Sequence, residues 1–332
     1  MDRDNIIKAF TENSPNYWNV LKNENELCIK KHKEKIYPYI EERIKNIDPK
    51  LNLENIVIGV TGSDGRLESY RSETDIVVLS KENIPIEEYY NILTELKPLT
   101  IEIKTMEQTL SYYSNDPKRI FPTRMIDFLE LNGDRCKRCY ESFFEKFFDE
   151  IITDRKIVKS VSERFKEYLK INNSGKQRWK NREIKHYDLE QGLLYYDENP
   201  ESVTFGPKYG PLRTIQFFIA KNLLQKPLDI MLGDKNKTKE LYRKLFYIMP
   251  RTTIERIDFL SEELINKRSI LPLSKESKNE LKDNYNYFLM QYHKLQEIYF
   301  INKNRIIVTT DKKELKERIN SINNIVTAQN KF

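Results

Sequence analysis

The stretch IVIGVTGSDGRLESYRSETDIVVLS, residues 56–80, decides the fold expected for the first half of the chain. Its first five residues, 56–60, are apolar and mostly β-branched, which predicts a buried strand. A turn with two glycines follows and is expected to open a helix over residues 62–71. The apolar run at residues 75–80 predicts a second strand, so the stretch indicates one repeat of an α/β sheet.

The turn carries groups that favour binding of an anion. Gly62 and Gly65 permit positive φ and close approach of the backbone, so the amide N–H groups of the turn can face a phosphate. Ser63 would add a hydroxyl group and Arg66 a positive charge. We therefore predict that these four residues bind phosphate.

Acidic residues follow the turn at a spacing that indicates a metal site. Glu73 and Asp75 are two positions apart, so in extended chain their carboxylates point to the same face. A third acid, Glu102, lies in the alternating stretch 99–104, which predicts another strand. Carboxylates beside a phosphate site suit Mg²⁺, which shares its coordination with nucleotide phosphates. An alternative register takes Asp75 as the first acid and leaves Val77 where the second ligand belongs.

This pattern resembles the nucleotidyltransferase superfamily with the DNA-polymerase-β-like fold. In that superfamily a Gly-Ser turn is followed by an acid-x-acid motif at a strand start, with a third acid on a later strand. The resemblance implies that Glu73, Asp75 and Glu102 are catalytic and bind Mg²⁺ or Mn²⁺, with a nucleoside triphosphate (NTP) as co-substrate. The Gly-Arg-x-Glu element at residues 65–68 is closest to the protein uridylyl- and adenylyltransferase-like branch.

Two later stretches are similar to segments of the same branch. Residues 125–134, MIDFLELNGD, resemble a segment in which a helix ends in Gly-Asp. Residues 208–216, KYGPLRTIQ, resemble a Gly-Gly-Leu-Arg-Asp-Ile stretch, which makes Lys208 and Arg213 candidates for nucleotide binding. The chain departs from the pattern at Glu73, where Asp is usual, and at Pro211 and Thr214, which replace the second Gly and the Asp of that stretch.

The resemblance implies transfer of AMP or UMP from an NTP to an acceptor hydroxyl, with release of pyrophosphate. The expected acceptor is a protein, and a small molecule such as an antibiotic is the alternative. Two other hypotheses stay open: a catalytically silent module that binds nucleotide or a partner, and an enzyme that modifies RNA. The RNA hypothesis depends on the basic residues around Trp179, at positions 176–185, although a solvated helix is the preferred interpretation of that stretch.

The expected fold class is α+β, with a small mixed-sheet nucleotidyltransferase domain followed by a mostly α-helical domain. The predicted divisions are a helical segment at residues 1–50, the α/β domain at 51–125 and the helical acceptor domain at 126–332. Helices are expected at 17–47, 86–96, 141–152, 211–224, 281–301 and 312–328, and residues 305–310 are either a strand or an extended connection.

Composition adds weaker constraints. A net charge of +6 is compatible with nucleotides or RNA as partners but does not require them. Three cysteines are too few for a disulfide framework, and although Cys136 and Cys139 have the spacing of a zinc knuckle, they lack matching ligands. No apolar run has the length of a membrane span, and the N-terminus does not resemble a signal peptide, so we expect a cytoplasmic protein without a membrane partner.

Overall fold

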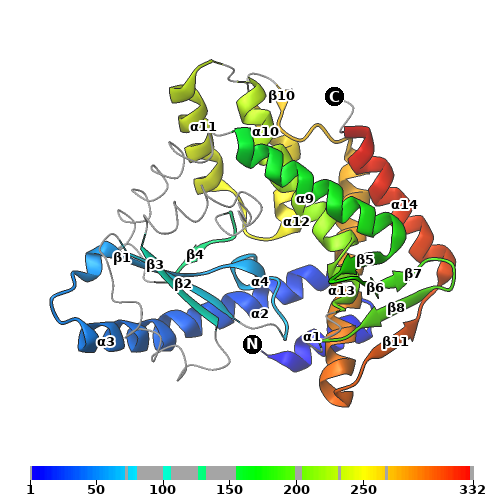
Figure 1. Cartoon of the computed structure of the whole chain (residues 1–332), viewed down its shortest axis with the longest axis horizontal. Helices are drawn as coiled ribbons and strands as arrows, with labels where there is room; N and C mark the ends of the chain where they lie inside the picture. The colour runs from blue at the N-terminus through cyan, green and yellow to red at the C-terminus, as the bar shows by residue number, and fades with distance from the viewer. Residues whose placement is uncertain are drawn as a thin grey trace. The chain divides into compact units, whose positions relative to one another are not determined.

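The computed structural model describes residues 2–71, 74–80, 100–105, 126–131, 155–198, 204–230, 233–265 and 268–329. These residues form a mixed α+β structure (Figure 1). The chain divides into two compact units. The first unit contains residues 21–160 and 227–252, and the second contains residues 2–20, 161–226 and 253–332.

The first unit is built around a sheet whose described strands have the order β3-β2-β1-β4. The strands are β1 (Ile56–Val60), β2 (Asp75–Ser80), β3 (Thr100–Thr105) and β4 (Leu129–Glu130). β1 is antiparallel to β2 and to β4, whereas β2 and β3 are parallel. The predicted strands at 56–60, 75–80 and 99–104 are thus confirmed to within one residue. The helix expected over 62–71 is wrong in length, because α4 ends at Gly65 and Leu67 has a φ of 59°.

One face of this sheet packs on helices that precede it in the chain. α2 (Tyr17–Lys31) and α3 (Tyr37–Ile47) are joined by a π-helical turn at His32–Ile36, which confirms the long or broken helix predicted for residues 17–47. Apolar side chains of these helices and of alternate strand positions form a single core: Ile29, Ile40, Ile44, Leu51, Ile56, Ile58, Val60, Leu67, Ile76, Val78 and Leu131. Because side chains alternate along a strand, Asp75 and Val77 belong to the opposite face of β2. The unit also contains α11 (Lys235–Ile248).

The second unit is organised around α13 (Lys275–Asn302), the long helix predicted at 281–301. Ser274 caps its N-terminus by accepting a hydrogen bond from the amide of Ser277, and Lys303 ends it in the left-handed conformation. The other helices with residues in this unit are α1 (Arg3–Thr11), the first turn of α2, α9 (Arg155–Ser174), α10 (Pro211–Ile230), α12 (Thr253–Glu262) and α14 (Lys312–Ala328). The boundaries of α14 are those predicted, and Asp311 caps it by accepting from the amide of Glu314.

The second unit also contains strands. Of the two alternatives for residues 305–310, the strand is the one observed, as β11 (Ile306–Thr309). The sequence analysis did not predict the others, which are β5 (Lys176–Trp179), β6 (Arg182–Lys185), β7 (Tyr187–Asp188), β8 (Leu193–Tyr196), β9 (Leu264–Ile265) and β10 (Arg268–Ser269). β11, β8 and β7 form an antiparallel sheet, whereas β5–β6 and β9–β10 are two-stranded ribbons. The described residues after position 154 are mostly helical, as expected, but they also contain these small antiparallel sheets, and the helix preferred for residues 176–185 is wrong.

The observed units differ from the three contiguous domains expected at 1–50, 51–125 and 126–332. Each unit combines segments that are far apart in the sequence, and three of the boundaries fall inside α2, α9 and α10. Sequence patterns report local structure, whereas a unit is defined by contacts between distant segments. The helices predicted at 86–96 and 141–152 lie outside the described residues.

Candidate active site

The turn between β1 and β2 begins with a glycine in a conformation that other residues rarely adopt. Gly62 has a φ of 65° and starts the single helical turn α4 (Gly62–Gly65). The amide of Thr61 donates to the carbonyl of Asp75 across 3.0 Å, which ties the start of the turn to the start of β2. Gly62 and Ser63 are half-buried, whereas Asp64 and Gly65 are buried. Of the residues predicted to bind phosphate, Gly62 and Ser63 are therefore more accessible than Gly65.

Gly65 is required by close packing rather than by its backbone angles. A Cβ atom at this position would lie 1.7 Å from the carbonyl oxygen of Asp127. Asp127 belongs to residues 125–134, the first of the two later stretches that resemble the nucleotidyltransferase branch. Two motifs separated by about 60 residues of sequence are thus in direct contact in the first unit.

Arg66 joins these two motifs through a buried network of charges. Its Nε donates to Oε2 of Glu68 across 3.0 Å, and its Nη1 donates to Oδ2 of Asp127. The three residues are 7%, 4% and 2% exposed, respectively. Buried charges of this kind are tolerated when they are paired and hydrogen-bonded. The structure thus gives Arg66 two carboxylate partners inside the unit, in place of the phosphate contact predicted for it.

Asp75 lies at the start of β2, beside the turn. An ideal Cβ on Gly62 would be 3.1 Å from Oδ2 of Asp75, so this carboxylate faces the first residue of the turn. The side chain of Asp75 is half-buried, which leaves it accessible to a ligand. Asp75 thus lies beside the turn predicted to bind phosphate, and its role as a metal ligand stays a prediction.

A second carboxyl group, which the sequence analysis did not select, lies in the same turn. Asp64 is 5% exposed, and its Oδ2 has no hydrogen-bond partner among the described residues. Burial raises the pKa of Asp64 to about 7, and the nearby carboxylate of Asp75 adds to the rise, while Ser69 and Arg66 act in the opposite direction. Asp64 is therefore a buried carboxyl group of the turn, and the charge of Asp75 opposes its ionisation.

The structure says less about Glu73 and Glu102, the other two acids predicted to bind the metal. Glu73 lies outside the described residues. Glu102 is paired with Val77 in the parallel ladder of β2 and β3. Paired positions of neighbouring strands lie on the same face of a sheet, so position 102 shares a face with positions 75 and 77. With strands roughly 4.8 Å apart and a rise of roughly 3.3 Å per residue, the Cα atoms of residues 75 and 102 are about 8 Å apart.

Lys208 and Arg213, the two basic residues predicted to bind nucleotide, belong to the second unit. The Nζ of Lys208 lies 5.2 Å from the ring centre of Phe205 and 5.7 Å from that of Tyr292. Arg213 is in the first turn of α10 and donates to Gln216 across 3.2 Å. Each side chain thus has contacts within its own unit.

The described residues contain no group of three or more His, Cys, Asp or Glu side chains that could hold a metal ion by themselves. His32 contacts Cys28 across 3.5 Å, His293 hydrogen-bonds Tyr17 and His186 hydrogen-bonds Gln177. Cys136 and Cys139 lie outside the described residues. A carboxylate pair is nevertheless sufficient for Mg²⁺, which usually retains water and takes phosphate oxygens as its remaining ligands.

Two residues of the site were missed from the sequence, Asp64 and Asp127. For Asp64 a signal was present, since an acid between two glycines of a tight turn is held close to the strand ends that flank the turn. For Asp127 no local signal existed, because its partner Arg66 is 61 positions away.

Comparison with known proteins leaves the chain unassigned. No model of a known protein family matches it, and no curated protein matches it in sequence. None of the helices in the described part of the chain combines the length and the apolar character needed to cross a membrane.

Proposed function

We propose that the chain transfers a nucleotide from an NTP to an acceptor hydroxyl at the turn between β1 and β2. The observation that carries this proposal is the carboxylate of Asp75, which faces a glycine turn that contains the half-buried Ser63 and the buried carboxyl group of Asp64. The register of β3 supports it, because position 102 shares the face of Asp75. These features are those expected where a divalent cation and a triphosphate bind together.

The residues present fit Mg²⁺ as the cation. Carboxylate oxygens are its usual protein ligands, and Oδ2 of Asp64 is a buried acceptor with no partner among the described residues. Asp64 and Asp75 would hold the ion, together with Glu102. Bound Mg²⁺ would neutralise charge on the phosphates. With a pKa of about 7, Asp64 is partly ionised at neutral pH and releases its proton readily when a cation approaches.

The protein groups have separate tasks in this reaction. The backbone of Gly62 and the hydroxyl of Ser63 contact the triphosphate. The network of Arg66, Glu68 and Asp127 holds the turn in place, so that Asp75 stays aligned with it. The acceptor hydroxyl attacks the α-phosphorus in line, the bond to the bridging oxygen breaks, and pyrophosphate leaves. Glu102 accepts the proton of the attacking hydroxyl.

The test is transfer of label from each of the four α-³²P-labelled NTPs, with Mg²⁺ or Mn²⁺ and a cell lysate as the source of acceptor. We expect label in a macromolecule that protease digestion destroys, since the acceptor proposed is a protein. Asp75→Asn and Glu102→Gln should each lower the rate by roughly 10²-fold or more, because misplacement of charge by 1 Å has that effect.

Glu54→Gln is the matched control, because Glu54 is an exposed acid that precedes β1 in the same unit. It should retain full activity, and all three variants should keep the circular dichroism of the parent protein. Transfer that survives in Asp75→Asn would refute the proposal. Binding of NTP without transfer to any size class of molecule would instead identify a catalytically silent module.

A further inference from the structure

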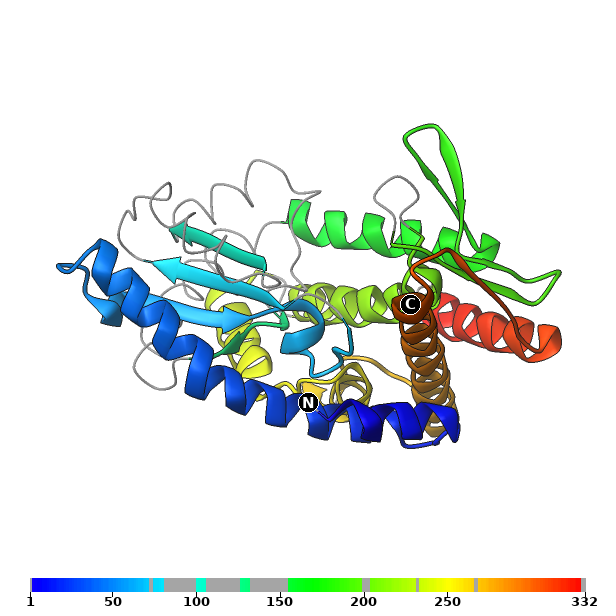
Figure 2. The ribbon, with the colours of Figure 1, turned by 90° about the horizontal axis from the view of Figure 1, so that it is seen from below.

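The β5–β6 hairpin of the second unit carries the basic residues around Trp179. Its strands are joined by Lys180 and Asn181, which have φ angles of 44° and 65°, the left-handed pair typical of a tight two-residue hairpin turn. Figure 2 shows the hairpin standing out from the helices of its unit. Side chains alternate between the two faces of a hairpin, and paired residues share a face. Trp179 and Arg182 therefore lie on one face, whereas Lys176, Arg178 and Lys185 lie on the other, and basic side chains are present on both.

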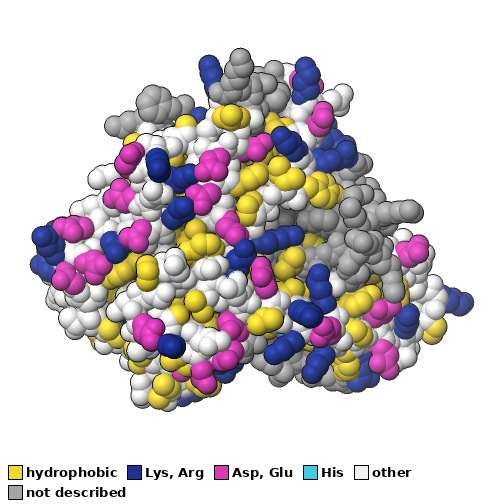
Figure 3. Space-filling model, turned by 180° about the vertical axis from the view of Figure 1, so that it is seen from behind, with side chains coloured by type: hydrophobic (Ala, Val, Ile, Leu, Met, Phe, Trp, Pro, Cys, Tyr) yellow, Lys and Arg dark blue, Asp and Glu magenta, His cyan; other side chains and the backbone are white. Residues whose placement is uncertain are grey.

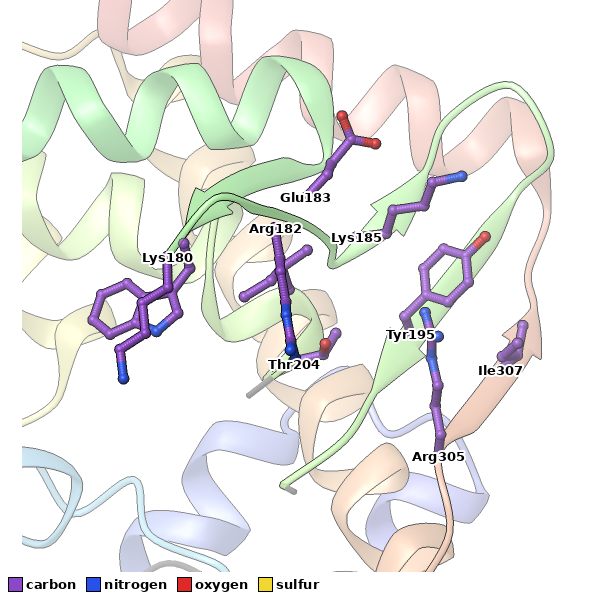
Figure 4. Close-up of a pocket in the computed structure, with 10 residues that line it drawn as sticks. Lys180, Arg182, Glu183, Lys185, Tyr195, Thr204, Arg305 and Ile307 are labelled. Atoms are coloured by element: carbon purple, nitrogen blue, oxygen red, sulfur yellow. The ribbon is translucent and has the colours of Figure 1, made fainter. Parts of the chain in front are cut away.

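A pocket of about 810 Å³ lies between this hairpin and the sheet β11–β8–β7. Figure 4 shows side chains of the hairpin, of β8 and of the segment around β11 that line it. All of its lining residues belong to the second unit: Trp179, Lys180, Arg182, Glu183, Ile184, Lys185, Tyr195, Thr204, Arg305 and Ile307. The volume is in the range of pockets that hold organic ligands.

The charges that line the pocket are mostly positive. Lys180, Arg182 and Lys185 form no ion pair or hydrogen bond with their side chains among the described residues, and the guanidinium of Arg305 lies 5.3 Å from the ring centre of Tyr195. Glu183, the acid among the described residues that line the pocket, is paired with Lys176 across 3.1 Å. By contrast, acidic and basic side chains are interspersed over the face drawn in Figure 3. The pocket is therefore suited to an anion with several charges.

The same pocket exposes flat and apolar surface. Trp179 is 54% exposed at the end of β5, and Ile307 is 56% exposed on β11. An indole ring in water next to unpaired cations is the combination that binds unpaired nucleobases, which stack on the ring while their phosphates meet Lys and Arg. A duplex does not offer its bases in this way, because they are already stacked and paired.

We propose that this pocket binds single-stranded nucleic acid, with one base stacked on Trp179 and the flanking phosphates on Lys180, Arg182, Lys185 and Arg305. The pocket is lined by residues of the second unit, whereas Asp64 and Asp75 belong to the first, and nucleotidyl transfer is not required for this binding. Stacking and phosphate contacts are common to RNA and DNA, so both are probes.

The test is a titration of tryptophan fluorescence with an unstructured RNA oligonucleotide of about 12 nucleotides, a length within the range of single-strand binding sites. The chain has two tryptophans, and Trp18→Phe leaves Trp179 as the sole reporter. We expect quenching on binding. Trp179→Ala, followed by anisotropy of a labelled oligonucleotide, should weaken binding by roughly 5- to 150-fold.

Salt dependence measures the phosphate contacts. If four cations each neutralise one phosphate, the slope of log K against log salt is about −2.8, which corresponds to roughly 50-fold weaker binding on going from 50 to 200 mM salt. The double variant Arg182→Gln/Lys185→Gln should reduce the slope to about −1.4. The double variant Lys166→Gln/Lys313→Gln, which removes two exposed lysines from α9 and α14, should keep the parent slope.

Phe300→Ala is the control for the aromatic residue, since Phe300 is 47% exposed on α13 and does not line the pocket. It should bind as the parent protein does. A matched single-stranded DNA identifies the occupant: tighter binding of RNA assigns RNA, and equal binding assigns any single strand. Binding that is unchanged in Trp179→Ala, or a duplex that binds as tightly as the single strand, would overturn the proposal.

Discussion

Replacing Asp64 by asparagine should change the pH dependence of stability in a way that can be calculated. The pKa of Asp64 is about 7 in the folded protein, against 3.8 for an ordinary Asp. Between these values the folded protein holds a proton that the unfolded chain has released, so this residue makes the free energy of unfolding decrease as pH rises. The contribution is fully present below the unfolded pKa and is lost above pH 7. Three pKa units correspond to about 4 kcal/mol.

Asparagine has nearly the same shape and cannot ionise. The difference in unfolding free energy between Asp64→Asn and the parent protein should therefore be constant below about pH 4 and should increase in favour of the variant by up to about 4 kcal/mol at about pH 8.5. The difference is the quantity to measure, because other groups titrate too. Burial lowers the pKa of His186 to about 4 and that of His293 to about 3, and both histidines are present in both proteins.

The assay is urea unfolding followed by circular dichroism at intervals from about pH 4 to about pH 8.5. Glu54→Gln serves as a control at an exposed acid of the same unit. If the difference in unfolding free energy between Asp64→Asn and the parent protein stays constant across this range, Asp64 is not a buried carboxyl group with a raised pKa.

Addition of Mg²⁺ at about pH 8.5 tests the proposed metal site separately from the raised pKa of Asp64. If Asp64 and Asp75 hold the ion, Mg²⁺ at 100 times its Kd stabilises the parent protein by about 2.7 kcal/mol and stabilises Asp64→Asn much less. A pH-dependent difference without any effect of Mg²⁺ would support the buried carboxyl group and argue against the metal site.

Three further results are expected. Gly65→Ala should lower the unfolding free energy by several kcal/mol, because its Cβ would lie 1.7 Å from the carbonyl oxygen of Asp127; a midpoint of urea unfolding equal to that of the parent protein would contradict the packing. Asp127→Leu should cost about 3–5 kcal/mol by leaving the charge of Arg66 with one carboxylate fewer, and the exposed Glu54→Gln should cost nothing measurable in the same assay. The parent protein should lose stability as pH falls from about 6.5 to about 4, because burial keeps His293 neutral while the unfolded chain takes up a proton there. His293→Gln should reduce this loss, and equal midpoints of acid unfolding for variant and parent would contradict the lowered pKa of His293.

Much of the first unit could be predicted because its signals are local. The β-branched run at 56–60 and the apolar run at 75–80 determine strands by their own periodicity, and a glycine at position 62 meets the need for a positive φ. The helix over 62–71 was predicted from the same kind of pattern and was wrong beyond Gly65. Past that point Arg66 contacts both Glu68 and Asp127, and the contact with Asp127 is not visible in a window of neighbouring residues.

The hairpin at residues 176–185 is an element whose type the sequence analysis did not predict correctly. Its residues are compatible with a helix. They form strands because Lys180 and Asn181 adopt left-handed backbone angles and turn the chain back on itself. The sequence by itself determined β1, β2 and β3, the glycine turn and the capped helix at 312–328, since each depends on residues within a few positions. Only the tertiary structure decided that Asp64 is buried, that Asp75 faces Gly62, that Arg66 meets Asp127 and that Trp179 lines a basic pocket, because burial and charge pairing act between residues that are distant along the chain.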